Sequence, residues 1–496
     1  MPATENHAHW MRGRGQILQV ALSFRMASCR WVAGVAVLLS LLAGCTHPTD
    51  RRRYISRSLQ QRTGEAPGDR DPASLQPSVP PDIDLNRPIT MDEAVAIALW
   101  NNADFQVALA ELGFTRAEVI RAGQLTNPTF SILFPVGPKQ LEFAAKFPVE
   151  AIWLRPRRIA IAEDQAAALA ERLVAGGLDL VRDVRLAACE LDLARERLKV
   201  LEESLRIRRE IGHLTEARVA AGDVSELEAV QSRADVARAA GEQVRLQRDF
   251  NLAEQRLRGL MGLGSAEVPF QLQALPVPED DAWDSVVTAG GDEAAGAPPV
   301  DGSRNEKERL AVYQRAAFAA RPELRAAELE LEAAGRQVGL TKAELFTLSA
   351  IVDANGSGSD FEIGPGLEMP LPILHQNQAA RALADARVAR AARQYVAVRE
   401  RVLAEVSAAR TRMTSAREER HAWEGTLAAL ETAARQARKA RELGELSRLA
   451  TLELDRAELD ARMQGRLVQS DYRRALIELE RAVGHGYGPW YSDNAP

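Results

Sequence analysis

The stretch RVAAGDVSELEAVQSRAD, residues 218–235, is the clearest guide to the fold, because a similar stretch recurs 222 residues later. The second version lies in KARELGELSRLATLELDRAE, residues 439–458. The equivalent positions are Gly222 and Gly444, Ser225 and Ser447, Leu227 and Leu449, and Gly262 and Gly484. A constant offset over this length indicates a duplicated structural half.

The composition favours long exposed helices. The chain has 496 residues, of which only 5% are aromatic and 27% are charged, and Ala, Leu, Arg and Glu dominate. Its formal net charge is −6, with acidic and basic residues interspersed. We therefore expect no nucleic-acid partner.

The N-terminus has the pattern of a secretory signal. Arg25 and Arg30 precede an apolar run, Trp31–Leu42, which ends in Leu42-Ala43-Gly44-Cys45. The run is too short to cross a bilayer, which needs about 20 residues. We predict a signal peptide over residues 1–44, with residues 1–25 as an over-extended start.

Leu-Ala-Gly-Cys resembles the bacterial lipobox, which implies cleavage before Cys45 and acylation of its thiol, for example by palmitate. Thr46, rather than Asp, follows the cysteine, which in that family of signals favours the outer membrane. Of the three cysteines, Cys29 lies in the signal, so only Cys189 stays a free thiol after processing. No intrachain disulfide and no cysteine metal cluster is expected.

The remaining chain divides into five segments. They are a lipidated, extended tether (45–88), a first repeat (89–264), an inter-repeat linker or equatorial segment (265–320), a second repeat (321–484) and a tail (485–496). Each repeat begins with a helix, which in the first repeat runs from a capping box at Thr90 and Glu93 to about Gln124. A β-hairpin follows, at 129–147 and at 346–369, because apolar and polar residues alternate there around Gly- and Pro-containing turns.

A long helical hairpin completes each repeat. Its first helix carries apolar residues in steps of three and four, which is a coiled-coil seam. The first seam is Leu180, Val184, Ala187, Leu191, Ala194, Leu198, Leu201 and Leu205, and the second is Val402, Val406, Ala409, Met413, Ala416, Arg420, Trp423 and Leu427. The chain reverses near Gly222 and Gly444, where glycine suits a left-handed helix C-cap.

Four strands with one apolar face each match outer-membrane strands in length, yet four strands cannot close a barrel. Open strand edges are not tolerated in lipid, so the chain must share a barrel with other copies. Two copies would give eight strands with a filled interior, and three would give twelve with room for a channel.

This duplicated order of helix, β-hairpin and long helical hairpin resembles the TolC-type outer-membrane factors, in their lipidated efflux branch, over residues 89–484. The motifs that carry the resemblance are Arg321-Pro322-Glu323-Leu324, the two glycine turns, and Asp471–Leu476 with Leu479–Gly484. The resemblance implies a mainly α fold with a small β part, in which a homotrimer forms a 12-strand outer-membrane β-barrel on a long α-helical barrel. It also implies a periplasmic adaptor and an inner-membrane pump of the RND or ABC type.

Carried over residue by residue, the resemblance places Gly222, Asp223, Ser225, Gly444, Glu445 and Ser447 at tips that dock the adaptor. Glu453 stands where members of the family often have a lumen-facing acid beside the constriction, and an exposed helix carboxylate is the equally favoured alternative. Ala450 replaces a second acid and Arg441 replaces an aromatic residue, so the chemistry of the tips can differ here.

The function expected is therefore a passive exit duct of a tripartite efflux or type I secretion system. No catalytic set, P-loop, cofactor motif or metal site is found, and the seven histidines are scattered, so we expect no enzyme activity. The alternative is a periplasmic coiled-coil adaptor or scaffold lipoprotein without a pore. The paired hairpins count against that alternative, and the sequence leaves open whether the cargo is a drug, a metal or a polypeptide.

Overall fold

The computed structural model describes residues 49–68, 77–134, 141–264, 269–276, 306–357 and 360–484. The chain forms two compact units. The sheet unit contains Thr115–Glu163 and Arg336–Ala384, and the helical unit contains Asp50–Phe114, Asp164–Gly335 and the residues from Asp385 onward. Helices α4, α5, α9 and α10 each run from one unit into the other.

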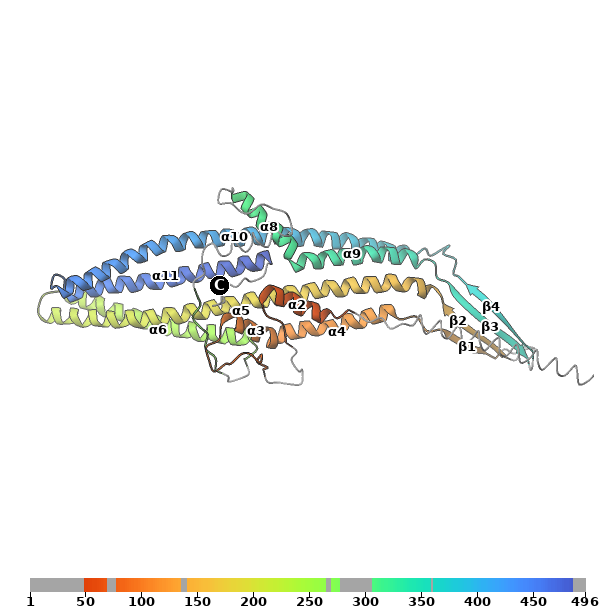
Figure 1. Cartoon of the computed structure of the whole chain (residues 1–496), viewed down its shortest axis with the longest axis horizontal. Coiled ribbons are helices and arrows are strands. Elements are labelled where there is room, and N and C mark those ends of the chain that lie inside the picture. The colour runs from red at the N-terminus through yellow and green to blue at the C-terminus, as the bar shows by residue number, and fades with distance from the viewer. Residues whose placement is uncertain are drawn as a thin grey trace, which may run out of the picture. The chain divides into compact units, whose positions relative to one another are not determined.

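The fold is mainly helical with a small strand part, as predicted (Figure 1). The elements are α2 (Arg51–Thr63), α3 (Met91–Asn101), α4 (Ala103–Gly123), β1 (Thr129–Leu133), β2 (Leu141–Pro148), α5 (Glu150–Ala220), α6 (Glu226–Leu260), α8 (Glu306–Ala320), α9 (Pro322–Ala343), β3 (Ser349–Ser357), β4 (Asp360–Glu368), α10 (Gln378–Glu442) and α11 (Arg448–Val483). Within the described ranges, no helix combines the length and the apolar character needed to cross a membrane.

The strands form one antiparallel sheet in the order β1-β2-β3-β4. Its central pair joins the two repeats, because β2 of the first pairs with β3 of the second. In the part of the chain that the structure describes, β1 and β4 each pair on one side only and leave the two edges of the sheet open. Open edges present unpaired backbone N–H and C=O groups that another strand can bind.

The register gives the sheet one apolar and one mostly polar face. Directly opposite residues lie on the same face of an antiparallel sheet. The apolar face carries Phe130, Ile132, Phe143, Ala145, Phe147, Ala350, Val352, Ala354, Ile363, Pro365 and Leu367. The opposite face carries, among others, Ser131, Glu142, Lys146, Asp353, Asn355, Glu362 and Glu368. The division matches the alternation seen in the sequence.

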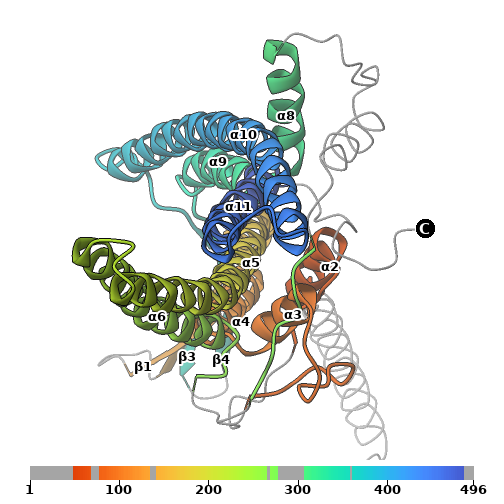
Figure 2. The ribbon, with the colours of Figure 1, turned by 90° about the vertical axis from the view of Figure 1, so that its left-hand side faces the viewer.

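In the helical unit the long helices lie in the order α6, α5, α11, α10, so α5 and α11 are flanked on both sides (Figure 2). One core packs α2, α3 and the start of α4 against α5, and a second packs α8 and α9 against α10 and α11. Every residue of the two predicted seams is buried or partly buried. Arg420, the polar member, lies with its guanidinium carbon 4.6 Å from the ring centroid of Tyr472.

The prediction of an extended tether is wrong for Arg51–Thr63, which is helix α2. Asp50 accepts a hydrogen bond at the N-terminus of this helix, and Gly64 ends it with φ of +79°. Two apolar residues hold α2 in the core: Ile55 and Leu59 are fully buried. Leu59 lies against Gly177 of α5, where an added Cβ would come within 2.8 Å of it.

The first helix of repeat one is also interrupted, contrary to the prediction of a single helix. Asn102 separates α3 from α4 because its side chain accepts a hydrogen bond from the Phe105 N–H at 3.0 Å and caps α4. Its amide donates to the Leu260 carbonyl at 3.1 Å. The turn predicted inside the hairpin at 129–147 lies outside the described residues. In the second hairpin, β3 continues to Ser357 and β4 begins at Asp360.

Candidate functional site

The two helical tips have the same backbone turn. Gly222 and Gly444 adopt φ of +81° and +79°, the left-handed region that favours glycine. The N–H groups of Asp223 and Glu445 each donate to the carbonyl five residues earlier, at 2.9 Å. This is the hydrogen-bond pattern of a Schellman C-cap, which satisfies carbonyls that the helix end leaves free.

The tips differ at the start of the next helix. Ser447 accepts a hydrogen bond from the Ala450 N–H at 3.2 Å, whereas the Ser225 side chain makes no capping bond. Each tip also exposes a large apolar side chain: Leu227 is 65% and Leu443 is 67% exposed. Single exposed apolar side chains are common on protein surfaces, so these two leucines do not by themselves mark a docking site.

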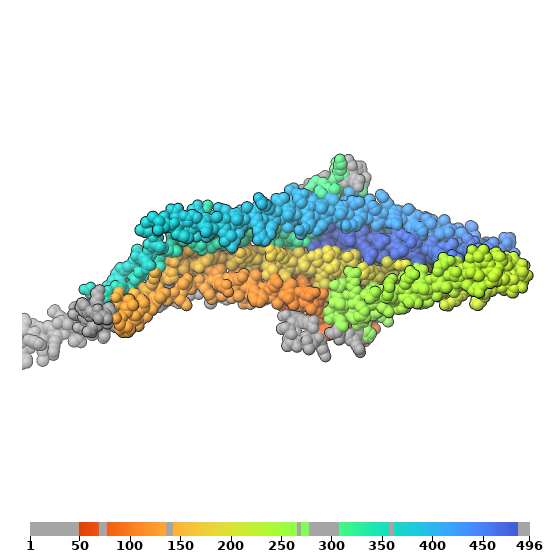
Figure 3. Space-filling view, turned by 180° about the vertical axis from the view of Figure 1, so that it is seen from behind, coloured from red at the N-terminus to blue at the C-terminus, as the bar shows by residue number. Residues whose placement is uncertain are grey.

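The tips lie at the same end of the helical unit (Figures 1 and 3). Arg448, directly after the second tip, forms an ion pair with Glu210 of α5 and so links the two hairpins near this end. The predicted tip residues, Gly222, Asp223, Ser225, Gly444, Glu445 and Ser447, are all exposed. Their role in docking stays a prediction.

Glu453 is exposed on the first turns of α11 and makes no ion pair with any residue that the structure describes. Its carboxylate can therefore face water, which agrees both with a lumen-facing acid and with an ordinary exposed helix carboxylate. Cys45 lies outside the described residues, and its acylation stays a prediction. Cys189 is buried in α5, and burial raises the pKa of its thiol to about 12, so it is protonated and unreactive at neutral pH.

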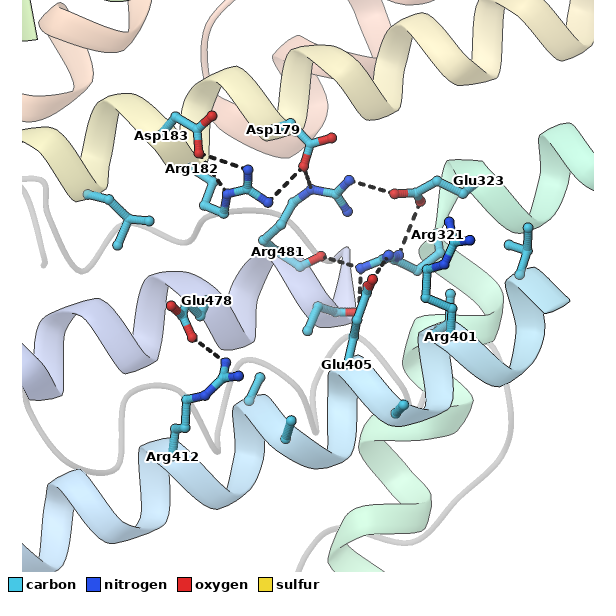
Figure 4. Close-up of a pocket in the computed structure, with 17 residues that line it drawn as sticks. Asp179, Arg182, Asp183, Arg321, Glu323, Arg401, Glu405, Arg412, Glu478 and Arg481 are labelled. Carbon is cyan, nitrogen blue, oxygen red and sulfur yellow. Dashed lines mark hydrogen bonds and ion pairs between the residues drawn. The ribbon is translucent and has the colours of Figure 1, made fainter. Parts of the chain in front are cut away.

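A charged network joins the repeats inside the helical unit (Figure 4). Arg481, near the end of α11, donates to Asp179 of α5 at 2.8 Å and to Glu323 of α9 at 2.5 Å. Arg321 donates to the carbonyls of Arg481 and Ala482, at 3.0 and 3.1 Å, where the α11 helix ends. Cations are favoured at a helix C-terminus because its free carbonyls carry partial negative charge.

The network keeps its groups charged. Burial alone would lower the pKa of Arg481, but Glu323 and Asp179 outweigh this effect and raise it. Burial likewise opposes ionisation of Glu323, yet Arg481 and Arg321 hold the pKa of this carboxyl below its usual value. These charged groups line a groove in which no serine, threonine, cysteine, histidine, lysine or tyrosine is found among the described residues. Its ion pairs and hydrogen bonds fix the two repeats together.

The sequence analysis did not predict that the N-terminal segment contacts the ends of α8 and α11. Arg62 of α2 donates to the carbonyls of Ala320 and Gly484, at 2.5 and 3.1 Å, and so caps the ends of α8 and α11. The partners are backbone carbonyls more than 250 residues away in the chain, so no local pattern could have indicated them. Among the described residues, no group of three or more His, Cys, Asp or Glu is placed to hold a metal ion.

The duplicated helix, hairpin and long helical hairpin match a known family. The model of the outer membrane efflux protein family matches residues 95–263 and 313–485, which is more than half of the chain and covers both repeats. The chain belongs to the outer membrane efflux protein family. As a member it is a component of an outer-membrane efflux channel, and the prediction of the family and of this function is confirmed.

Relatives of this efflux protein agree with the assignment. It is 26% identical to the cobalt-zinc-cadmium resistance protein CzcC of Cupriavidus metallidurans over 410 residues, which cover 80% of this chain and 90% of the relative. Two solved structures share its fold. The CusC channel matches with a TM-score of 0.60 and 20% identity, over 85% of this chain and 99% of that one. The MtrE channel of Neisseria gonorrhoeae, in its open state, matches with a TM-score of 0.59 and 16% identity, over 80% and 89%.

Proposed function

We propose that three copies of this chain form one outer-membrane channel, a passive exit duct fed by an inner-membrane pump through a periplasmic adaptor. Each copy contributes four strands to a 12-strand barrel, and the helical units form a tunnel in the periplasm. Acylated Cys45 adds a lipid anchor. The observation that carries the proposal is the sheet, which has one apolar face and two open edges.

The apolar face needs an apolar surrounding. Phe130, Ile363 and Leu367 are 63, 73 and 75% exposed in the single chain. Large apolar side chains gathered on one exposed face mark a surface that contacts lipid or another protein. On the other face, Lys146 pairs with Glu368 at 2.6 Å, as suits a face turned to water. A barrel wall with lipid outside and water inside satisfies both faces.

The open edges require neighbouring copies. In lipid every backbone polar group must be paired, so β1 of one copy has to bind β4 of the next until the sheet closes. Two copies would close eight strands, whose interior is only wide enough for side chains. The interior face here carries long charged side chains such as Glu142 and Glu362, which need water around them. Three copies give twelve strands and leave that space.

The exposed tips support docking of the adaptor at Gly222 to Ser225 and Gly444 to Ser447. A duct without catalytic groups takes its cargo from the pump, which is of the RND or ABC type. The name of the CzcC relative favours divalent cations such as cobalt, zinc and cadmium as that cargo. Growth of a deletion strain on these metals tests this point: sensitivity restored by the native gene supports it, and unchanged metal tolerance contradicts it.

The protein mass of the detergent-solubilised particle, measured by light scattering, tests the channel itself. We expect three chains in each particle and ionic conductance after insertion into a planar bilayer. A monomer that stays soluble without detergent would contradict the proposal and favour the scaffold lipoprotein without a pore.

A further inference from the structure

In the sheet unit, the parts of the helices next to the strands are rich in positive charge. They are residues 115–123, 150–163, 336–344 and 374–384, from α4, α5, α9 and α10 with their adjoining turns. They carry four acidic residues and eight basic ones, although the whole chain has a net charge of −6. The basic residues are Arg116, Arg121, Arg155, Arg157, Arg158, Arg336, Lys342 and Arg381.

Helix stability does not explain this charge. Arg155, Arg157 and Arg158 lie in the first turns of α5, where the partial positive charge of a helix N-terminus disfavours cations. Arg157 is exposed, donates to the Gly339 carbonyl of α9 at 3.3 Å, and pairs with no carboxylate among the described residues. Lys342 is exposed and has no ion pair or hydrogen bond to its side chain within the described ranges. Both cations can therefore bind an anion from outside the chain.

Apolar side chains lie between these two cations and the strands. Trp153 precedes Arg157 by four residues and is 44% exposed, and Phe346 follows Lys342 by four residues and is 59% exposed. Four residues are about one helical turn, or ~5.4 Å along the axis. Each cation thus lies about one turn further from the sheet than an exposed aromatic ring. Ile152 and its equivalent 222 residues later, Leu374, are also exposed, by 40 and 94%.

These side chains continue the apolar face of the sheet. On β4 that face carries Ile363 and Leu367. The same alternation goes on past the end of the strand, where Met369, Leu371 and Ile373 are 49, 68 and 72% exposed. A period of two is that of an extended chain with one apolar side. The apolar surface therefore reaches beyond the last strand pair to the start of α10.

The exposed side of α5 has no room for another helix in the layer, because both neighbours come from the same chain. Arg155 Nε donates to the Gly123 carbonyl of α4 at 2.7 Å, and Leu154 and Ile161 pack against Leu340 of α9. The side that stays exposed carries Ile152, Trp153, Pro156 and Arg157. A water-filled lumen would leave the isoleucine and the tryptophan in water, whereas the outside of a membrane channel offers them lipid.

We propose that this surface binds anionic phospholipid head groups of the membrane leaflet next to the helices. We call it the collar, and it consists of Ile152, Trp153, Arg157, Lys342, Phe346 and Leu374. Its apolar side chains lie at the border of the hydrocarbon, where tryptophan is favoured, and its two cations bind lipid phosphate about one turn further out. The proposal rests on the proposed outer-membrane channel and adds which lipids surround it.

The charge of the collar favours phosphatidylglycerol over phosphatidylcholine. Both lipids have a phosphate that Arg157 and Lys342 can bind. Phosphatidylcholine also carries a quaternary ammonium group, which the two cations of the collar repel. Phosphatidylglycerol carries no such group, so its net charge of −1 complements the collar.

Native mass spectrometry of the detergent-solubilised particle tests the proposal with dioleoyl-phosphatidylglycerol and dioleoyl-phosphatidylcholine. The two lipids have the same acyl chains, so a difference in affinity reports the head group. We expect tighter binding of the phosphatidylglycerol. The double variant Arg157→Gln with Lys342→Gln should weaken that binding by about fivefold for each removed charge and should not weaken binding of the phosphatidylcholine.

Three further variants separate the collar from general effects. Arg245→Gln with Lys439→Gln removes the same charge from exposed positions of α6 and α10 in the helical unit, and should leave both affinities unchanged. Lys342→Gln alone should still cost about fivefold, and it removes no contact inside the described ranges on which folding could depend. Trp153→Ala should weaken both lipids alike, because its ring contacts the acyl chains rather than the charge.

The outcomes keep this inference apart from the channel proposal. Equal binding of the two lipids by a particle of three chains would overturn the inference and leave the channel standing. Equal losses in the collar and control double variants would show only a general attraction of cations for anionic lipid, and would also overturn it. A single chain that is soluble without detergent would refute both proposals.

Salt gives an independent check. The preference for phosphatidylglycerol should shrink when ammonium acetate is raised from about 50 mM to about 500 mM, because salt screens contacts between exposed charges. A preference that does not change over this range would contradict binding through Arg157 and Lys342.

Discussion

Glycine to valine exchanges at Gly222 and Gly262 separate the role of the tip from that of the fold. Both glycines adopt positive φ, +81° and +67°. A side chain in this region costs ~1–2 kcal/mol, and a β-branched residue lies at the upper end of the range. The surroundings differ, because a Cβ at Gly222 meets nothing within 4 Å, while one at Gly262 would lie 2.4 Å from the Asn101 carbonyl oxygen.

These geometries set the expected magnitudes. Gly222→Val should destabilise the protein by ~2 kcal/mol from backbone strain alone. Gly262→Val adds ~1–3 kcal/mol because the backbone around Asn101 must move, which gives ~3–5 kcal/mol in total. The midpoint of denaturant unfolding in detergent measures the difference, and the assembly of trimers should survive the first exchange better than the second.

Efflux by a pump-containing strain completes the experiment. Gly222→Val should leave the oligomer intact but abolish export, because the bulky side chain changes the surface offered to the adaptor, and Gly444→Val should behave in the same way. Normal export by both tip variants would show that these turns are not the docking site. Equal loss of stability at Gly222 and Gly262 would refute the steric reasoning.

Three further predictions concern single residues. Cys45→Ala should abolish labelling of the protein by radioactive palmitate, and persistent labelling would exclude this cysteine as the lipid site. Glu453→Gln should reduce the cation selectivity of the open channel in planar bilayers if the carboxylate faces the lumen, whereas unchanged selectivity would make it an ordinary exposed helix carboxylate. Burial, followed by repulsion from Asp92 and Glu93, raises the pKa of Glu65 from 4.5 to about 7. The unfolded chain therefore loses this proton first, and stability should fall as pH rises from 4.5 to about 7. Glu65→Gln should flatten that decline and stabilise the protein by ~1 kcal/mol above pH 7, since water screens about half of the carboxylate, and an unchanged pH profile of thermal unfolding would refute the assignment.

The repeated pattern was predictable because its signals are local. The glycines at 222 and 444 indicated where helices end, and both adopt the positive φ that glycine allows. Alternation of apolar and polar residues fixed which side of each strand is apolar, and the register of β2 with β3 agrees with it. These features need only a few neighbouring residues to be recognised.

Helix α2 could not be predicted from local sequence signals. Only Ile55 and Leu59 of this helix enter the core, and three successive arginines precede them. So few apolar residues do not make a recognisable amphipathic pattern, and the helix owes its stability to packing on α5. The tip residues were placed from the family resemblance, but the capping role of Arg62 depends on carbonyls at the far end of the chain.

Local sequence patterns were enough to predict the duplication, the faces of the strands and the helix turns, because periodicity and backbone preference act over short distances along the chain. The packing of whole elements, in contrast, was needed to show that β2 pairs with β3 and that α5 and α11 lie between α6 and α10. It also showed that Arg481 binds both Asp179 and Glu323. Such contacts join residues far apart in the sequence. They follow from how whole elements pack rather than from any local pattern.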